Sequence, residues 1–426
     1  MAYSKVVMID CPDPDNVLMA LWVLKQFPDS PVAIVLSARP VSFKAALYRN
    51  AFQRLLNAVG DIRKLINPLT ENSLRDAEKT WLKDLPQKDR AWFRVSDDFS
   101  DPTVREDTRL YMQVTAFRMV NFWKAHGIGP TRYRIYWDKA SMTNAKIGVG
   151  MAHSFHVHDW SFDFNGDERQ RYDQALRSIS DAEGNVIVPL SDGYRVQNRA
   201  ICIDYVARMA QASGWTAENI LGDFDHFIVE NKTAGVVADL YVGGPFPDAL
   251  AYVQRAPVTE VVGMGGNLKS GSTLFANQFN FHVALESATE FLTYVVDHKI
   301  KLTLLPTECV KGSVFALSRE ELFTVFEASE AAVRVCLQYY DSANGHGQSF
   351  PLFDLIAVLT VQHRDLYPRK AVRVRRVDEK TPDANRQDVI EWVEDPKGHI
   401  QMYWPDQDHM KLKKAELLDA IRATVE

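Results

Sequence analysis

A mostly parallel α/β fold, with a central sheet and helices on both of its faces, is the fold class that the sequence predicts. Short apolar segments alternate with segments in which apolar residues recur at helical spacing. This alternation is present in the first 60 residues and resumes after about residue 235. Strand–helix–strand repetition with short links is typical of parallel sheets with right-handed crossovers.

In the first part of the chain, strands are expected over residues 6–9 and 32–36. Each is followed by a helical pattern, over 17–27 and over about 46–59, and Gly60 ends the second helix. The later part predicts three more strands with helices between them. The strands are 235–242, 258–264 and 300–305, and the helices are 249–253 and 286–296.

Residues 62–198 differ from their surroundings because they are rich in charged and aromatic residues and show few clean strand patterns. We interpret them as an α-rich insertion within a single domain that spans residues 1–426. The tail, 372–426, predicts a short hairpin of 389–393 and 399–404, followed by an amphipathic helix.

Composition narrows the classes of function. With 46% hydrophobic and 24% charged residues in 426, the chain can bury a substantial core. A net charge of −6 argues against general binding to nucleic acids or membrane surfaces. We expect a cytoplasmic protein, because no secretory signal or apolar stretch of membrane-spanning length is evident and the four cysteines are scattered. A small-molecule ligand is the expected partner, and a homo-oligomer is left open.

An acidic turn follows the first strand directly. Residues 10–16 read D-C-P-D-P-D-N, which gathers three carboxylates and an amide where a strand gives way to a helix. Like charges packed this densely repel one another unless a cation neutralises them, and oxygen ligands suit calcium or magnesium. A solvated turn that caps the next helix is the alternative.

Three further segments carry polar groups at expected strand or helix ends. Gly243 follows a buried strand, and its carbonyl could coordinate a cation, although a tight turn would need the same glycine. Side-chain amides gather in 264–267 and 277–281, as ligands for sugar hydroxyls or as turn residues. Asp354 opens an apolar helix, either as a cap or as a further cation ligand.

Three histidines, His153, His156 and His158, lie close to Asp159. Zinc binding is one interpretation of the His-x-His spacing. A loop that lends an acid to a nearby site is the interpretation we prefer, because histidine titrates near neutral pH.

Taken together, these segments resemble the inosine–uridine-preferring nucleoside hydrolase family in order and approximate spacing. The family turn D-x-D-P-G-x-D-D is similar to residues 10–16, and its R-N-A-x-x-L-L is similar to 49–56. Its G-P-L-T-N turn resembles G-P-F-P-D at 244–248. Its M-G-G and A-E-F-N-F-Y-V-D-P-E-A segments resemble 264–266 and 277–287, and its H-D-P-L-A-V helix resembles F-D-L-I-A-V. The resemblance covers about the first 60 residues and nearly everything after residue 198.

The resemblance implies a bound Ca²⁺, or Mg²⁺, held by Asp13, Asp15, Asp354 and the carbonyl of Gly243. It also implies that Asp13 is the general base that activates water. Asp10 is the alternative turn carboxylate, because the extra Pro12 shifts the alignment of the turn.

Substrate contacts are altered relative to the family. The candidate substrate-binding residues are Arg39, Asn16, Ser272, Gln278 and Asn280. Asn16 replaces a carboxylate of the family, Gln278 a glutamate and Ser272 an asparagine. Phe353 replaces a histidine that is a candidate leaving-group acid in purine-acting members of the family. Either the three histidines at 153–158 supply the acid, or the substrate carries a leaving group that departs as a neutral molecule.

The function that this resemblance implies is metal-dependent hydrolysis of the N-glycosidic bond of a nucleoside or related N-riboside, through an oxocarbenium-like transition state. Such an enzyme would act in purine or pyrimidine salvage. Two alternatives stay open. One is a glycosyl transferase that uses the same chemistry, and the other is a catalytically inactive ligand-binding or scaffold protein on the same fold.

Overall fold

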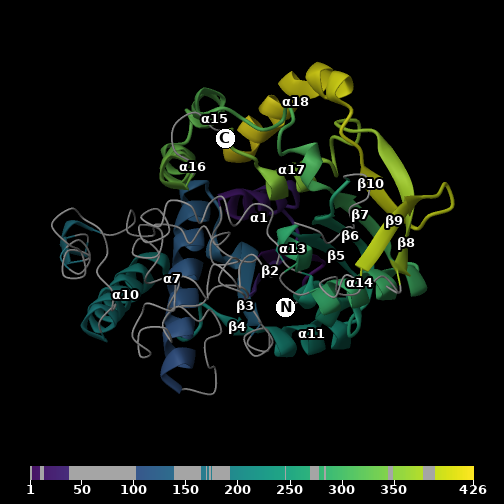
Figure 1. Cartoon of the computed structure of the whole chain (residues 1–426). Helices are drawn as coiled ribbons and strands as arrows, with labels where there is room; N and C mark the ends of the chain where they lie inside the picture. The colour runs from purple at the N-terminus through teal and green to yellow at the C-terminus, as the bar shows by residue number, and fades with distance from the viewer. Residues whose placement is uncertain are drawn as a thin grey trace, which may run out of the picture. The chain divides into compact units, whose positions relative to one another are not determined.

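In the computed structural model, the described residues form one sheet of ten strands (Figure 1). The residues that the structure describes are 2–9, 14–37, 102–138, 165–168, 170–171, 174, 192–244, 246–268, 278–282, 285–343, 349–377 and 389–426. The chain divides into two units. The first comprises 1–37, 119–141 and 222–426 and contains the whole sheet, and the second comprises 38–118 and 142–221.

The strands follow one another across the sheet in the order β4-β3-β2-β1-β5-β6-β7-β10-β8-β9. Their bounds are β1 Lys5–Ile9, β2 Val32–Ser37, β3 Tyr133–Asp138, β4 Gly222–Asp223, β5 Ala238–Val242, β6 Val258–Met264, β7 Lys301–Leu305, β8 Arg369–Val377, β9 Val389–Glu394 and β10 Ile400–Tyr403. From β4 to β10 all neighbours are parallel, and only β8 pairs antiparallel, with β10 and β9. The predicted mostly parallel α/β fold is thus confirmed.

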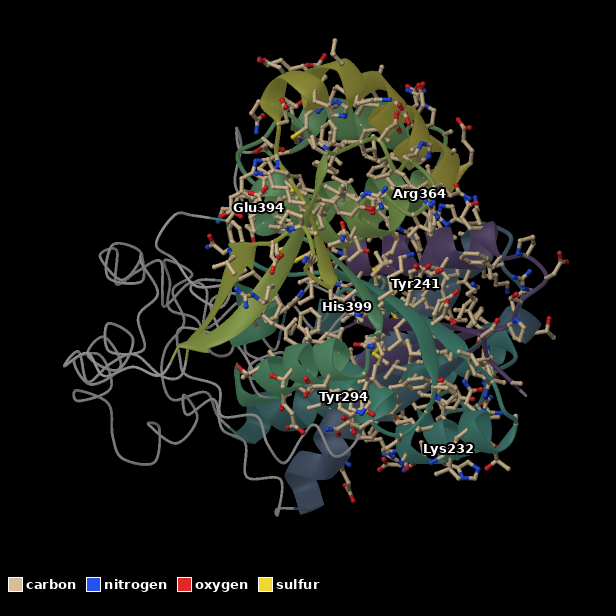
Figure 2. The ribbon with its side chains drawn as sticks, turned by 90° about the vertical axis from the view of Figure 1, so that its right-hand side faces the viewer. Lys232, Tyr241, Tyr294, Arg364, Glu394 and His399 are labelled. Atoms are coloured by element: carbon tan, nitrogen blue, oxygen red, sulfur yellow. The ribbon has the colours of Figure 1, made fainter. Side chains whose placement is uncertain are left out.

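Helices cover both faces of the sheet, as a parallel sheet requires. Residues of α11 (Phe224–Thr233), α12 (Pro247–Val253) and α14 (Leu285–Asp297) share a hydrophobic core with one face. On the other face, α1 (Pro14–Gln26), α17 (Phe353–Leu359) and α18 (Gln407–Val425) pack together. Figure 2 shows the two layers, with Lys232 of α11 and Tyr294 of α14 below the sheet and Arg364, just after α17, above it.

Apolar sequence explains the central strands. All six residues of β2, V-A-I-V-L-S, are buried, and so are the last four of β1. A strand buried on both faces gains from a continuous run of β-branched and aliphatic side chains. Only the last residue of β2, Ser37, interrupts this run with a polar side chain.

Two sequence interpretations need correction. β9 pairs with β8 and not with β10, so 389–393 and 399–404 do not form the expected hairpin, because β8 lies between them. Residues 62–198 also contain a strand of the main sheet, β3, which was not predicted. The terminal helix α18 is confirmed. The helix expected over 46–59 lies outside the described residues.

In the second unit, the described residues are mainly helical. They include the first part of α7 (Pro102–Ala125) and α10 (Asp192–Ser213). The guanidinium of Arg208 on α10 donates to both carboxylate oxygens of Glu168, at 3.0 and 2.7 Å. Among the helices that the structure describes, none has the length and hydropathy needed to cross a membrane.

Candidate functional site

The order of the strands reverses beside β1. From β1 the chain passes through α1 to β2 on one side, and later it enters β5 on the other side of β1. Ligands of open α/β sheets bind outside the carboxyl ends of the strands at such a switch point. The candidate residues that follow β1 and β5 therefore lie where the topology favours a site.

Asp15, Asn16 and Asp354 form a buried, hydrogen-bonded group at this place. Their side chains are 4%, 2% and 5% exposed. The backbone N–H of Asp354 donates to Asp15 Oδ2 at 3.2 Å, and the side-chain amide of Asn16 donates to Asp354 Oδ2 at 2.9 Å. Asp15 Oδ1 also accepts from the N–H of Asn16, at 3.1 Å. The first turn of α1 and the first turn of α17 are thus joined through two carboxylates.

Gly243, the residue after β5, lies against this group. Its N–H donates to the carbonyl of Met8 at 2.9 Å, which extends the pairing of β5 with β1. A Cβ at position 243 would lie 2.8 Å from Asn16 Oδ1 and 3.0 Å from Asp354 Cγ. Real Cβ atoms almost never come within 2.8 Å of another heavy atom, so a side chain at position 243 would require these neighbours to shift. The sequence prediction that Gly243 allows close approach is consistent with this packing.

Asn280 on α13 (Phe279–His282) links the ends of β5 and β6. Its side-chain amide donates to the carbonyls of Gly243, at 3.2 Å, and Met264, at 3.1 Å. Gln278, just before α13, is also engaged within the protein. Its Nε2 donates to Met264 Sδ at 3.3 Å, and its Oε1 accepts from the N–H of Phe281 at 3.1 Å.

The segment that follows β6 is fixed by hydrogen bonds from several parts of the chain. Gly265 N donates to the carbonyl of Leu305, and the carbonyl of Gly266 accepts from Thr307 N. The indole of Trp392 on β9 donates to the carbonyl of Asn267 at 3.0 Å. Trp392 was not predicted as a site residue, because its role depends on the position of β9 in the sheet.

Buried polar residues also end β2 and β3, namely Ser37 and Asp138, with 2% and 6% exposure. Neither residue was predicted as a site residue from the sequence. A polar residue at the end of an otherwise apolar strand is the signal that could have found them, once 133–138 was known to be a strand.

Several predicted site residues cannot be placed. The residues outside the described part of the chain are Asp10, Asp13, Arg39, His153, His156, His158 and Ser272. The predicted set Asp15, Asn16, Gly243, Asn280 and Asp354 does come together, and Gln278 lies beside it.

The oxygen donors of this group are of the kind that a hard divalent cation prefers. Among the described residues, Asp15 and Asp354 offer carboxylates and Gly243 offers a carbonyl. No cluster of three or more histidine, cysteine or acidic residues suited to a metal is found within the described ranges. The acidic turn 10–13, which would add further ligands, lies outside them.

Comparisons with known proteins give no match to a family model and none to a curated protein sequence. Among solved structures, the chain is similar to an inosine-uridine preferring nucleoside hydrolase from Bacillus anthracis, with a TM-score of 0.45 and 12% identity over 100% of this chain and 99% of that one. An inosine-guanosine nucleoside hydrolase gives 0.47 and 12% over 99% and 98%. The type III effector protein XopQ, complexed with adenosine diphosphate ribose, gives 0.45 and 10% over 100% and 95%. Two of these three are named as nucleoside hydrolases, one of them as inosine-uridine preferring, and at such identities and TM-scores they assign neither membership nor activity to this chain.

Proposed function

We propose that this chain hydrolyses the N-glycosidic bond of a nucleoside or a related N-riboside with the help of a divalent cation. The observation that supports the proposal is the convergence of Asp15, Asp354 and Gly243 at the switch point of the sheet. These residues come from three distant parts of the chain and correspond to three of the segments that resemble the hydrolase family. Salvage of nucleosides in the cytoplasm is the setting that we propose for the activity.

The residues fit a cation such as Ca²⁺, with Mg²⁺ as the alternative. Asp15, Asp354 and the Gly243 carbonyl would hold it, together with Asp13. Two buried carboxylates in one hydrogen-bonded group repel each other, and a cation would relieve this repulsion. When bound, such an ion supplies positive charge for the sugar hydroxyls and acidifies a water molecule.

The chain's own residues would carry the remaining chemistry. In this proposal Asp13 takes a proton from the attacking water as general base. The carboxylates of Asp15 and Asp354 stabilise the positive charge that develops on the sugar in an oxocarbenium-like transition state. Asn280 fixes the carbonyl of Gly243 through its amide hydrogen bond, and so it holds one of the proposed oxygen ligands in place.

The leaving group needs its own explanation because Phe353, at the start of α17, cannot transfer a proton. One route is an acid from outside the described residues, with His153, His156 and His158 as candidates. The other is a substrate whose leaving group departs as a neutral molecule, as from a positively charged N-riboside such as nicotinamide riboside. If one of these three histidines is the acid, the rate should fall as the pH rises above neutrality. Replacing that histidine by alanine should remove this dependence.

A ligand-binding protein without hydrolytic activity is the second candidate, and the arrangement of Gln278 favours it. Both ends of the Gln278 amide are engaged by Met264 and Phe281 within the protein. In this alternative, the amide of Gln278 serves the fold and contacts no substrate. Asn16, which donates to Asp354, is likewise a structural donor where the family has an acid.

Calcium titration by calorimetry, followed by an assay of free ribose over a panel of neutral and cationic ribosides, tests the proposal. We expect calcium to bind and at least one riboside to be cleaved only in its presence. Calcium binding without cleavage of any riboside would favour the ligand-binding protein. Protein that binds neither calcium nor magnesium would contradict the proposed site itself.

A further inference from the structure

Ser37 and Asp138 are direct neighbours at the carboxyl ends of β2 and β3. They are Cα partners in the register of the two parallel strands, and each is the last residue of its strand. Both are more than nine-tenths buried. Ser37 Oγ has no hydrogen-bond partner among the described residues. A buried hydroxyl without a partner is unfavourable, so a ligand that supplies one would be favoured at this position.

The register of the sheet places this pair close to the site already described. Ile9 in β1 is level with Leu36 in β2 and with Trp137 in β3, so Ser37 and Asp138 lie one residue beyond Ile9. Neighbouring strands are about 4.8 Å apart, so β3 ends about 10 Å to the side of β1. A ligand whose sugar lies over β1 and β5 would therefore reach β2 and β3 with the group attached to the sugar.

The pair also shares a face of the sheet with α13. Val35 and Tyr136 belong to the core beneath α11 and α12, and side chains two residues apart on a strand point to the same face. Ser37 and Asp138 are two residues after them and thus lie on this face. Phe281 of α13 belongs to the same core. Polar side chains therefore stand on both sides of the end of β1, with Asn280 on one side and Ser37 and Asp138 on the other.

We propose that Ser37 and Asp138 form a leaving-group subsite that recognises a nitrogenous base through its N–H donors. The inference rests on the proposed function, because the base is the group that leaves the sugar. The oxygens of a carboxylate accept hydrogen bonds, so Asp138 would favour amino, amide or ring N–H groups, and the hydroxyl of Ser37 would add a second contact. The subsite binds and orients the base, and it does not supply the proton that Phe353 cannot donate.

Free adenine and free purine test the subsite without any need for hydrolysis, because they differ only in an exocyclic amino group. By calorimetry, the wild-type protein should bind adenine about tenfold more tightly than purine. Asp138→Asn should remove most of this difference, and Ser37→Ala should reduce it. Asp239→Asn is the matched control, because Asp239 is a partly buried carboxylate near the amino end of β5, paired with Lys5. It should keep the preference for adenine.

The outcomes separate the subsite from the proposed function. Three results would overturn the subsite, even if ribosides are still cleaved. The wild type could bind the two bases equally, it could bind neither, or its preference could survive both Asp138→Asn and Ser37→Ala. A preference that these variants abolish, in a protein that cleaves no riboside, would support the subsite and reject the hydrolase. If Asp138→Asn fails to fold, as judged by its melting curve, Ser37→Ala decides alone.

Discussion

The side-chain amide of Asn16 donates a hydrogen bond to Asp354 Oδ2 over 2.9 Å, although 338 positions separate the two residues in the chain. This bond joins the start of α1 to the start of α17 within the buried group that contains Asp15. A carboxylate at position 16 would repel Asp354, whereas the amide supplies it with a donor. The amide of Asn16 thus stabilises the carboxylate of Asp354 within the buried group.

Asn16→Asp should make the protein depend more strongly on calcium. Without a cation, the loss of the donor and the added charge should lower the free energy of unfolding by about 1–3 kcal/mol. Calcium should recover much of this loss. Urea unfolding with and without calcium measures both effects. Asn219→Asp, at an exposed turn where the oxygen already accepts from Thr216 N, is the control and should change little. An Asn16→Asp variant as stable as wild type in chelator would contradict the repulsion.

Gly243→Ala should destabilise the protein, and Gly263→Ala should not. At 243 the new methyl group would lie 2.8 Å from Asn16 Oδ1 and from Met19 Cε, whereas at 263 its nearest atom would be 3.4 Å away. Forcing extra volume into a packed site costs about 1–3 kcal/mol. Urea denaturation of the two variants measures the difference. Equal stability of the pair would show that the site is less tightly packed than described.

Asp354→Asn should abolish the stabilisation by calcium. Calcium at 100 times its dissociation constant stabilises a folded protein by about 2.7 kcal/mol, because only the folded state gathers the ligands. We expect wild type to melt about 3 °C higher under these conditions, and Asp354→Asn to show no shift. Asp419→Asn, an exposed carboxylate on α18 that pairs with Arg422, should keep the full shift. An unchanged response of Asp354→Asn would place the cation elsewhere.

Much of the sheet could be predicted from the sequence because its strands are continuous apolar runs. The expected strands 258–264 and 300–305 differ from β6 and β7 by at most one residue, and the helix 286–296 differs from α14 by one residue at each end. β3 was not predicted because Y-R-I-Y-W-D mixes aromatic and charged residues, and such a mixture is also typical of surface segments.

The order of the strands across the sheet could not be predicted from the sequence. The meeting of Asp15, Gly243 and Asp354 in one place was implied by the resemblance to the hydrolase family, and each of them follows or opens a recognisable element. The position of Ser37 at the end of an apolar strand could have been predicted, whereas its pairing with Asp138 and the role of Trp392 depend on which strands lie side by side. β8 was not foreseen, and its insertion between β9 and β10 is the reason that the predicted hairpin was wrong.

Asp13→Asn should abolish hydrolysis while the protein keeps its fold. An amide cannot take a proton from water at neutral pH, so turnover should fall by about 100-fold or more. Ribose release and the melting curve are measured on the same preparation. Asp10→Asn is the comparison, because the extra Pro12 leaves open which turn carboxylate is the base. Substantial turnover by Asp13→Asn together with an inactive Asp10→Asn would move the role to Asp10.

His126 should make the protein less stable as the pH falls below neutrality. Burial lowers the pKa of His126 from its usual value of 6.5, and the nearby charge of Lys25 lowers it further, against a raising effect of the Phe122 carbonyl. The Nδ1–H donates to this carbonyl at 2.8 Å, so the neutral ring accepts from Ser329 Oγ at Nε2, also at 2.8 Å. The folded state thus favours the neutral ring, whereas the unfolded chain takes up a proton near pH 6.5.

Because the unfolded state binds the proton first, the contribution of His126 to stability is complete above pH 6.5 and declines as the pH falls from 6.5 towards the lowered folded pKa. His126→Gln lacks this group, so its free energy of unfolding should change less than that of wild type between about pH 7.5 and 5.5. Urea denaturation at several pH values measures the two slopes. His226→Gln, which changes a histidine that is 72% exposed on α11, controls for the substitution itself. Identical slopes for wild type and His126→Gln would show that the ring takes up its proton equally readily in the folded and unfolded states.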